Sequence, residues 1–232
     1  MSTPLEVRNR RREAQRTIRL AINATNTNID AWKAAIDDGK KHATNLTNAI
    51  LTSGHIPQLP MAALKDIPNL KNATLNKLSL EIARHYTLLA NSLTSLEGAA
   101  AGLVAAIAPL AELALQEKSE SLLHGSPVFT LLPLHTIAGM FEKVEKRYWA
   151  ELERKRAVVE DFQTSAVEAQ KLAAATINSS TNIYSVKGGK SPIECSKGFL
   201  QVHITAWMLS PEIEEEAVQA DLSVLTQDAA SC

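Results

Sequence analysis

Aromatic residues, cysteines and net charge are all scarce in this chain of 232 residues. Aromatic residues make up only 4% of the sequence while alanine and leucine are abundant, a mixture that favours helix-on-helix packing over a β-sheet. The two cysteines, Cys195 and Cys232, form no metal-ligand spacing and fit a reduced, intracellular compartment. The formal net charge is −1, so whole-molecule charge predicts neither nucleic-acid binding nor acidic substrates.

Apolar targeting segments are not expected either. The N-terminus lacks the apolar core of a signal peptide, and we expect no apolar run long enough to span a bilayer, hence no membrane partner. The sequence is nevertheless 45% hydrophobic and 21% charged, which excludes a disordered tail. Its length suits one elongated domain or two small ones.

Motifs that carry chemistry are missing as well. The histidines show no i,i+4 metal spacing, and the sequence contains no H-E-x-x-H motif. The segment from Val186 to Ser191 resembles a phosphate-binding loop only faintly, because the first glycine is absent and no strand precedes it. We therefore predict no catalytic residue, no cofactor and no metal, and a protein that is not an enzyme.

Apolar heptads predict a first long helix from about Leu5 to Ser53, which Gly54 and Pro57 end. Thr25 and Gly39 weaken one of its two seam positions. The apolar seam residues are Ile18, Ile22, Ile29, Trp32, Ile36, Ala43, Leu46 and Ile50.

A second helix is predicted to start near Ala73, and its seam repeats every seven residues without interruption. The seam residues are Leu75, Ile82, Leu89, Leu96, Leu103 and Leu110. The run from Gly98 to Gly102 should permit close backbone approach, and Pro109 should bend or end the helix.

A third helix is predicted from about His135 to Ala175, with Glu142–Lys146 and Glu151–Lys155 as ion pairs on its outer face. Its apolar positions are Ile137, Phe141, Val144, Tyr148, Leu152, Val159, Phe162, Ala166, Ala169 and Ala173. A flexible loop follows at 178–198, then a short helix from about Phe199 to Leu209 and an acidic helix from near Pro211.

Together these elements predict an all-α fold, namely an elongated antiparallel three-helix coiled-coil bundle with short C-terminal helices. The predicted domains are a long-helix bundle over residues 1–177, the loop at 178–198, and a C-terminal helical tail at 199–232.

One basic cluster stands out near the N-terminus, comprising Arg8, Arg10, Arg11, Arg12, Arg16 and Arg19. Its members Arg8, Arg10, Arg11 and Arg12 form a possible nuclear import signal, and an exposed helix start is the alternative. Direct nucleic-acid binding is not expected, because the rest of the chain is net acidic and opposes it.

Three sequence matches, in the same order along the chain, resemble the cyclin-dependent kinase 2-interacting protein family. The first is Pro127-x-Phe129-x-x-x-Pro133. The second comprises Tyr148, Glu151-Leu152, Lys155-Arg156 and Val158, followed by Asp161-Phe162. The third is Trp207-x-x-x-Pro211-x-Ile213. The loop at 178–198 is longer than this family leads us to expect.

The resemblance implies a nuclear adaptor in DNA replication, cell-cycle checkpoint signalling and DNA repair. It implies a cyclin-dependent kinase and a replication kinase as partners, and a hetero-oligomer with an AAA-type ATPase and a small helical co-subunit. The predicted partner-binding residues are Tyr148, Glu151, Leu152, Lys155, Arg156, Trp207 and Pro211.

Three alternatives stay open from the residues alone. The first is a coiled-coil structural subunit of a tethering, kinetochore or cytoskeletal assembly. The second is a helical-bundle enzyme, which would require inward-facing polar ligands that the apolar seams do not provide. The third concerns Trp207, which is either a core residue closing one end of the bundle or an exposed anchor for a partner.

Overall fold

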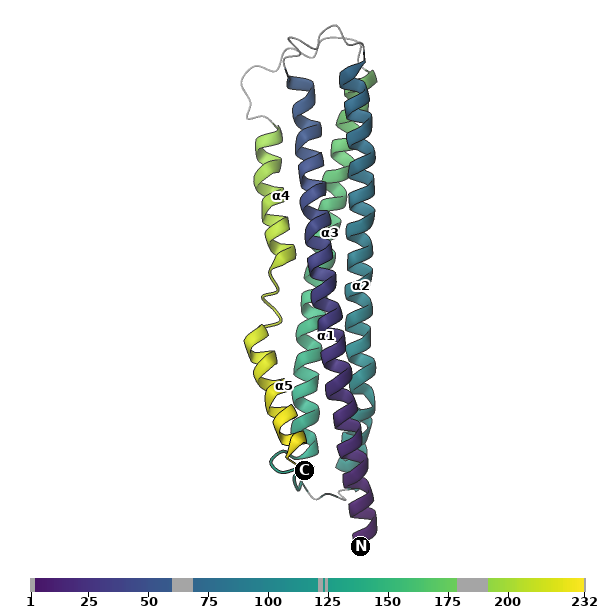
Figure 1. Cartoon of the computed structure of the whole chain (residues 1–232), viewed down its shortest axis with the longest axis vertical. Helices are drawn as coiled ribbons and strands as arrows, with labels where there is room; N and C mark the ends of the chain where they lie inside the picture. The colour runs from purple at the N-terminus through teal and green to yellow at the C-terminus, as the bar shows by residue number, and fades with distance from the viewer. Residues whose placement is uncertain (1–2, 60–68, 121–122, 124, 179–191, 232) are drawn as a thin grey trace. The chain divides into compact units, whose positions relative to one another are not determined.

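The computed structural model describes residues 3–59, 69–120, 123, 125–178 and 192–231, and this part of the chain is all-helical (Figure 1). The elements are α1 (Pro4–His55), a short 3-10 helix (Ile56–Gln58), α2 (Leu70–Glu120), α3 (Leu134–Asn178), α4 (Pro192–Met208) and α5 (Glu215–Ala230). Within the described residues, strand-like pairing is limited to an isolated bridge between Pro127 and Pro133. The predicted all-α class is confirmed.

The helices α1 and α3 begin and end, and α2 begins, within a few residues of the predicted positions, but other boundaries differ. Pro109, expected to bend or end the helix, lies inside α2 and therefore does not end it. The helix α4 begins at Pro192 rather than near Phe199, and α5 begins at Glu215 rather than near Pro211. Most of the predicted loop at 178–198 lies outside the described residues, as does Cys232.

Residue contacts group the chain into two compact units, and each unit takes one part of every long helix. Unit 1 comprises residues 1–34, 95–153 and 210–232, and unit 2 comprises residues 35–94 and 154–209. Each unit therefore combines segments of α1, α2 and α3 with one short helix, α5 in unit 1 and α4 in unit 2. The predicted domain boundaries at 177 and 198 follow the chain order, whereas these contacts join distant segments.

In unit 2, contacts between side chains define how the long-helix segments run. The Ser92 hydroxyl of α2 donates to Asp38 of α1 at 3.1 Å, and the His85 ring lies 6.0 Å from that of His42. Because residue numbers rise along α1 as they fall along α2, these two segments are antiparallel. The C-terminal part of α3 contacts α2 through Gln170, whose amide donates to the Ser79 carbonyl at 3.3 Å.

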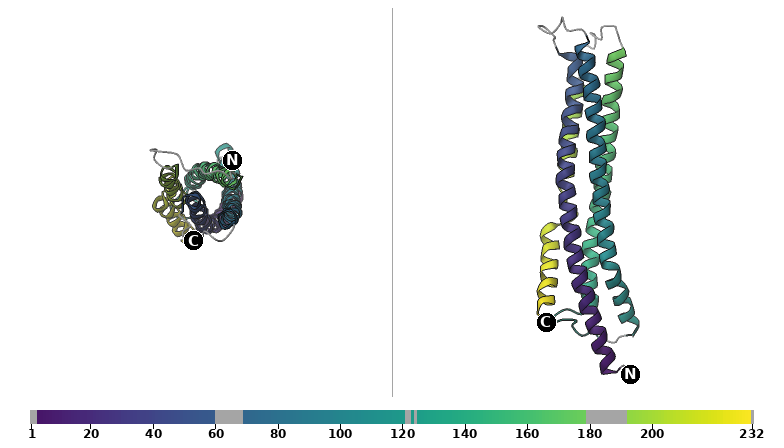
Figure 2. Two further views of the ribbon diagram at one scale, coloured as in Figure 1. Left: turned by 90° about the horizontal axis from the view of Figure 1, so that it is seen from above. Right: turned by 45° about the vertical axis from the view of Figure 1, so that its right-hand side comes forward.

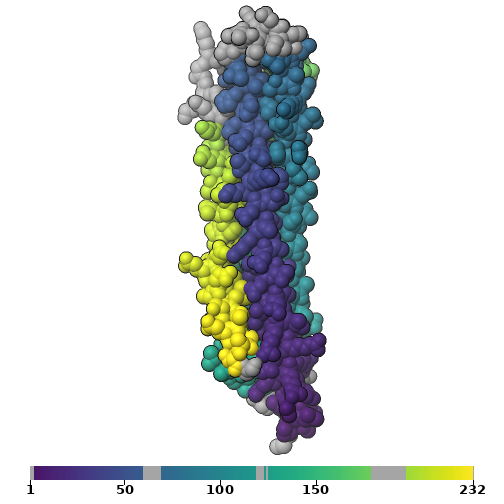
Figure 3. All heavy atoms as spheres, viewed as in Figure 1, coloured from purple at the N-terminus to yellow at the C-terminus, as the bar shows by residue number. Residues whose placement is uncertain are grey.

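In unit 1, a buried carboxylate joins α5 to the segment that precedes α3. Asp228, only 2% exposed, accepts backbone N–H bonds from Thr130, Leu131 and Leu132 at 2.8–3.2 Å. Such bonds supply the partners that a buried charge requires. From α1, Arg19 donates to the Ala229 carbonyl at 3.1 Å, so α5 and the N-terminal part of α1 lie side by side (Figures 2 and 3).

The predicted seam of α2 forms the centre of both units. All six of its residues are 0% exposed, with Leu75, Ile82 and Leu89 in unit 2 and the others in unit 1. Most of the predicted α1 and α3 seam positions are buried too, and Ile36 and Ala169 are half-buried. The apolar pattern therefore predicts that burial of this repeat is the main source of the protein's stability.

Two glycines of α2 behave differently from one another. A Cβ at Gly102 would overlap the Asn28 side chain of α1, so close approach at this position is confirmed. A Cβ at Gly98 would meet nothing within 4 Å, so the expectation of close approach there is wrong.

The apolar character of α2 also bears on membranes. By length and composition alone, the segment Leu70–Lys118 is sufficient to cross a bilayer, so the expectation that no apolar run is long enough is wrong. A mostly buried core helix of a helical bundle passes the same test, and in α2 the seam is buried while 33% of the most apolar 18-residue window is buried in all. One such helix is weak evidence for a membrane span.

Truncating the α2 seam should destabilise the protein strongly. We expect Leu103→Ala to lower the free energy of unfolding by about 2–5 kcal/mol, because it leaves a cavity in a packed core. Leu80 of the same helix is 73% exposed, so Leu80→Ala is the matched control and should change stability by less than about 0.5 kcal/mol. Urea denaturation followed by circular dichroism measures both, and equal effects would contradict the assignment of the seam.

Candidate protein-binding site

The seven predicted partner-binding residues divide between the two units. Five have buried side chains: Tyr148, Glu151 and Leu152 in unit 1, and Lys155 and Trp207 in unit 2. Arg156 is half-buried and Pro211 is exposed. The buried five make their contacts within the chain, and the prediction that they bind a partner stays a prediction.

In unit 1, Tyr148 and Glu151 join α3 to its surroundings. Tyr148 packs edge-on against Trp32 of α1, with ring centroids 5.1 Å apart. Burial raises the pKa of the Tyr148 phenol, and the nearby carboxylates of Glu215 and Asp30 raise it further. Glu151 accepts the backbone N–H of Glu212 at 3.2 Å, next to Pro211, so a buried carboxylate fixes the approach to α5.

In unit 2, the buried ammonium of Lys155 caps the C-terminal end of α4. Its Nζ donates to the carbonyl oxygen of Ala206 at 2.9 Å and also to that of Leu209. The last carbonyls of a helix lack partners within the helix and carry the negative end of its dipole, so a cation stabilises them. Lys155 is therefore a structural link between α3 and α4.

Trp207 of α4 is fully buried against α1, which confirms the interpretation of this residue as a core residue. Its indole N–H donates to the Ile36 carbonyl at 3.0 Å. The indole covers Gly39, where an added Cβ would overlap the ring. Gly39 weakens the α1 seam in the sequence, but its missing side chain leaves the space that the Trp207 indole occupies.

A third polar contact, from His203, also places α4 against α3. The His203 Nε2 lies 2.7 Å from an oxygen of Asp161, and Nδ1 lies 2.7 Å from the Phe199 carbonyl oxygen. Both ring nitrogens of His203 therefore lie within hydrogen-bond distance of an oxygen atom. Asp161, part of the family-like motif, thus contacts a residue that the sequence did not single out.

The predicted ion pairs of α3 differ in their outcome. Lys146 and Glu142 form an exposed pair at 2.6 Å, as predicted. The expectation that Glu151 and Lys155 lie on the outer face is wrong, because both side chains are 0% exposed. Periodicity alone assigned charged residues to the surface, but here backbone groups of the C-terminal segments surround them.

The outward side of α4 carries apolar residues that the sequence reasoning missed. We define the α4 patch as Phe199, Val202 and Met208 of α4 together with Leu209 directly after it, which are 46%, 64%, 43% and 58% exposed. The opposite side buries Leu200, His203 and Trp207, so this helix is apolar on two sides. The signal available in the sequence was the step of three residues from Phe199 to Val202 and of seven from Val202 to Leu209.

The four residues of the predicted import signal differ in their contacts and exposure. Arg10 binds Glu13 at 3.2 Å and Gln116 at 3.0 Å, and Arg11 donates to the Ser126 hydroxyl at 3.1 Å. Arg8 and Arg12 are exposed on the same helix.

No protein-family model matches this sequence, and comparison with curated proteins finds no similar sequence.

Adding a side chain at Gly39, where the Trp207 indole packs, should destabilise the protein. We expect Gly39→Ala to cost about 1–3 kcal/mol, because its methyl group overlaps the indole. Gly98→Ala is the matched control, since it adds a methyl group where nothing lies within 4 Å. That variant should stabilise the helix by about 0.5–1 kcal/mol through helix propensity alone. Thermal unfolding of both variants gives the test, and a stabilising Gly39→Ala would contradict the packing of Trp207.

Removing the Lys155 charge should destabilise unit 2. Lys155→Met keeps an unbranched side chain but leaves buried carbonyl groups of α4 without their donor, which costs about 1–3 kcal/mol. Lys143→Met on the exposed side of α3 is the control and should have little effect. Chemical denaturation measures the difference, while hydrogen exchange should show faster exchange of α4 amides in Lys155→Met only.

Proposed function

We propose that this chain is a non-enzymatic nuclear adaptor in DNA replication, cell-cycle checkpoint signalling and DNA repair. Its proposed partners are a cyclin-dependent kinase, a replication kinase, and an AAA-type ATPase with a small helical co-subunit. The support for these partners is the resemblance of the segments at Pro127–Pro133, Tyr148–Phe162 and Trp207–Ile213 to the cyclin-dependent kinase 2-interacting protein family.

The finer architecture is part of the same proposal. We propose that α1, α2 and α3 form an elongated three-helix coiled coil with antiparallel neighbours and that the short helices pack on it. The seven-residue repeat of α2 and its complete burial support this arrangement.

The observation that carries the adaptor proposal is the two-sided character of α4. Lys155, His203 and Trp207 hold this helix in place through hydrogen bonds to backbone and side-chain groups. With its position fixed, the α4 patch exposes apolar side chains, among which Phe199 and Val202 are three residues apart and Val202 and Leu209 seven. Such a row is what a partner helix needs for side-by-side packing, and it loses little conformational entropy on binding because its helix is already anchored.

This view revises which residues contact the partner. The motif residues Lys155 and Trp207 act as positioning residues, and the α4 patch makes the contact. We propose the AAA-type ATPase complex as the occupant, through a helix of one of its subunits. Nuclear import through the N-terminal arginines belongs to the same proposal, with Arg8 and Arg12 as the exposed contributors.

The test is affinity purification of the tagged chain followed by mass spectrometry. The variant is Val202→Glu with Leu209→Glu, which places charge in the α4 patch. We expect the wild-type chain to retain the ATPase and the replication kinase, and the variant to lose the ATPase complex because burying an unpaired carboxylate is unfavourable. The matched control, Leu80→Glu with Val224→Glu, changes two other exposed apolar residues and should keep its partners.

Circular dichroism first establishes that each variant is as helical as the wild type. Recovery of vesicle, kinetochore or microtubule proteins in place of the ATPase and kinase would favour the structural coiled-coil alternative. Full retention of the ATPase by the folded α4 variant would place the interface elsewhere.

A further inference from the structure

A second surface, in unit 1, lies on the outward side of the first turns of α1. We define the arginine face as Arg8, Arg12, Arg16 and Arg19, whose spacing by four, four and three residues places their Cα atoms along one stripe of the helix, from which the side chains extend to either side. All four are exposed. The buried residues of this stretch, Ala14, Ile18 and Ala21, lie on the opposite side.

The acidic residues of the same stretch do not neutralise this face. Glu6 accepts the backbone N–H of Thr3 at 2.7 Å, and Glu13 pairs with Arg10. Arg8, Arg12 and Arg16 have no hydrogen bond or ion pair with any residue that the structure describes. Arg19 differs, since it donates to Ala229 and its guanidinium lies 5.3 Å from the Phe129 ring centroid.

Folding alone does not account for this arrangement. Like charges four residues apart on a helix repel one another, and the arginine face contains two such neighbouring pairs, Arg8 with Arg12 and Arg12 with Arg16. A bound anionic partner would reverse the sign of this interaction, since each guanidinium would then meet a carboxylate.

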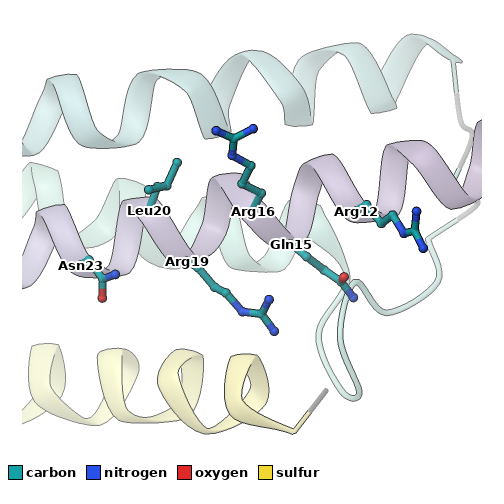
Figure 4. A pocket seen from close by; sticks show the side chains of 6 residues that line it. All are labelled: Arg12, Gln15, Arg16, Arg19, Leu20 and Asn23. Carbon is teal, nitrogen blue, oxygen red and sulfur yellow. The ribbon is translucent and has the colours of Figure 1, made fainter.

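A shallow cavity and exposed apolar side chains accompany the arginine face, and both bear on which anionic partner it could bind. A shallow cavity of about 340 Å³ lies over it, lined by Arg12, Gln15, Arg16, Arg19, Leu20 and Asn23 (Figure 4). Arg16 and Leu20 extend toward one side of α1, whereas Arg12 and Arg19 extend toward the other (Figure 4). Leu5 and Leu20 are 65% and 59% exposed, so apolar side chains accompany the cations.

We propose that the arginine face binds an acidic amphipathic helix of a partner protein. From Arg8 to Arg19 the face extends roughly 16 Å along α1, about three helical turns. Glutamates spaced by three or four residues on a parallel or antiparallel helix match this row, and leucines of that helix match Leu5 and Leu20. A nucleic acid would use the arginines but not the exposed leucines, and the net charge of −1 opposes it.

This proposal does not depend on the adaptor function. It shares Arg8 and Arg12 with the proposed import signal, but the proposed contact with the ATPase complex rests on the α4 patch of unit 2, and a direct binding measurement involves no import. A direct binding measurement with the purified full-length chain therefore tests it separately from the purification experiment.

The probe is a fluorescein-labelled, alanine-based helical peptide that carries glutamates and leucines along one face. Fluorescence anisotropy should show saturable binding that weakens with added salt. The same peptide with glutamine in place of glutamate should bind at least about ten-fold more weakly, because it lacks the paired charges.

The test variant is Arg8→Glu, Arg12→Glu and Arg16→Glu. We expect at least about ten-fold weaker binding of the glutamate peptide, because attraction becomes repulsion. The matched control is Lys40→Glu, Lys41→Glu and Lys171→Glu, which reverses three exposed charges elsewhere. It should bind within about two-fold of the wild type, since separated exposed charges are screened by salt.

Three results would overturn the proposal: no saturable binding of the glutamate peptide, equal loss of binding in both triple variants, or tighter binding of a double-stranded DNA oligonucleotide than of the peptide. If circular dichroism shows that the triple glutamate variant is unfolded, Arg12→Gln with Arg16→Gln replaces it. Unchanged binding by that folded variant would also reject the arginine face as the site.

Discussion

Burial of an uninterrupted seven-residue repeat along α2 is the constraint on which both units depend. Each unit buries three of the six seam residues completely, and the α1 and α3 segments contribute their own apolar rows around them. Apolar burial is strong but not directional, so it explains why the three long helices associate without explaining where the short helices attach. Those positions require contacts with defined geometry.

Buried polar groups provide that geometry, and they do so by the same principle in the two units. In unit 2 the ammonium of Lys155 meets carbonyls at the end of α4, and in unit 1 the carboxylate of Asp228 meets the amides of Thr130 to Leu132. A buried charge is costly unless several hydrogen bonds satisfy it, and backbone groups outside regular pairing can provide them. Each buried charge therefore fixes the position of one connecting segment, and it also satisfies backbone hydrogen-bonding groups of that segment.

This division explains how much of the structure the sequence could predict. Helical periodicity correctly predicted the long helices and the α2 seam, because those depend on the spacing of apolar side chains along one element. It failed at Glu151 and Lys155, since a charged residue at such a position is ordinarily exposed and its burial depends on backbone groups more than fifty residues away. Gly39 is a similar case, because the need for a glycine at this position comes from the packing of the Trp207 ring and not from α1 itself.

The distinction between apolar burial and buried charged groups also bears on function. The residues of the family-like motif are unusual on a heptad helix, but the buried ones among them make contacts inside the chain. The two surfaces that we propose for partners are instead exposed: the α4 patch in unit 2 and the arginine face in unit 1. One is apolar and anchored by three polar contacts behind it, and the other is cationic with its neighbouring acids already engaged. Because the α4 patch depends on apolar burial and the arginine face on charge, raising the ionic strength should weaken binding at the arginine face while leaving binding at the α4 patch nearly unchanged.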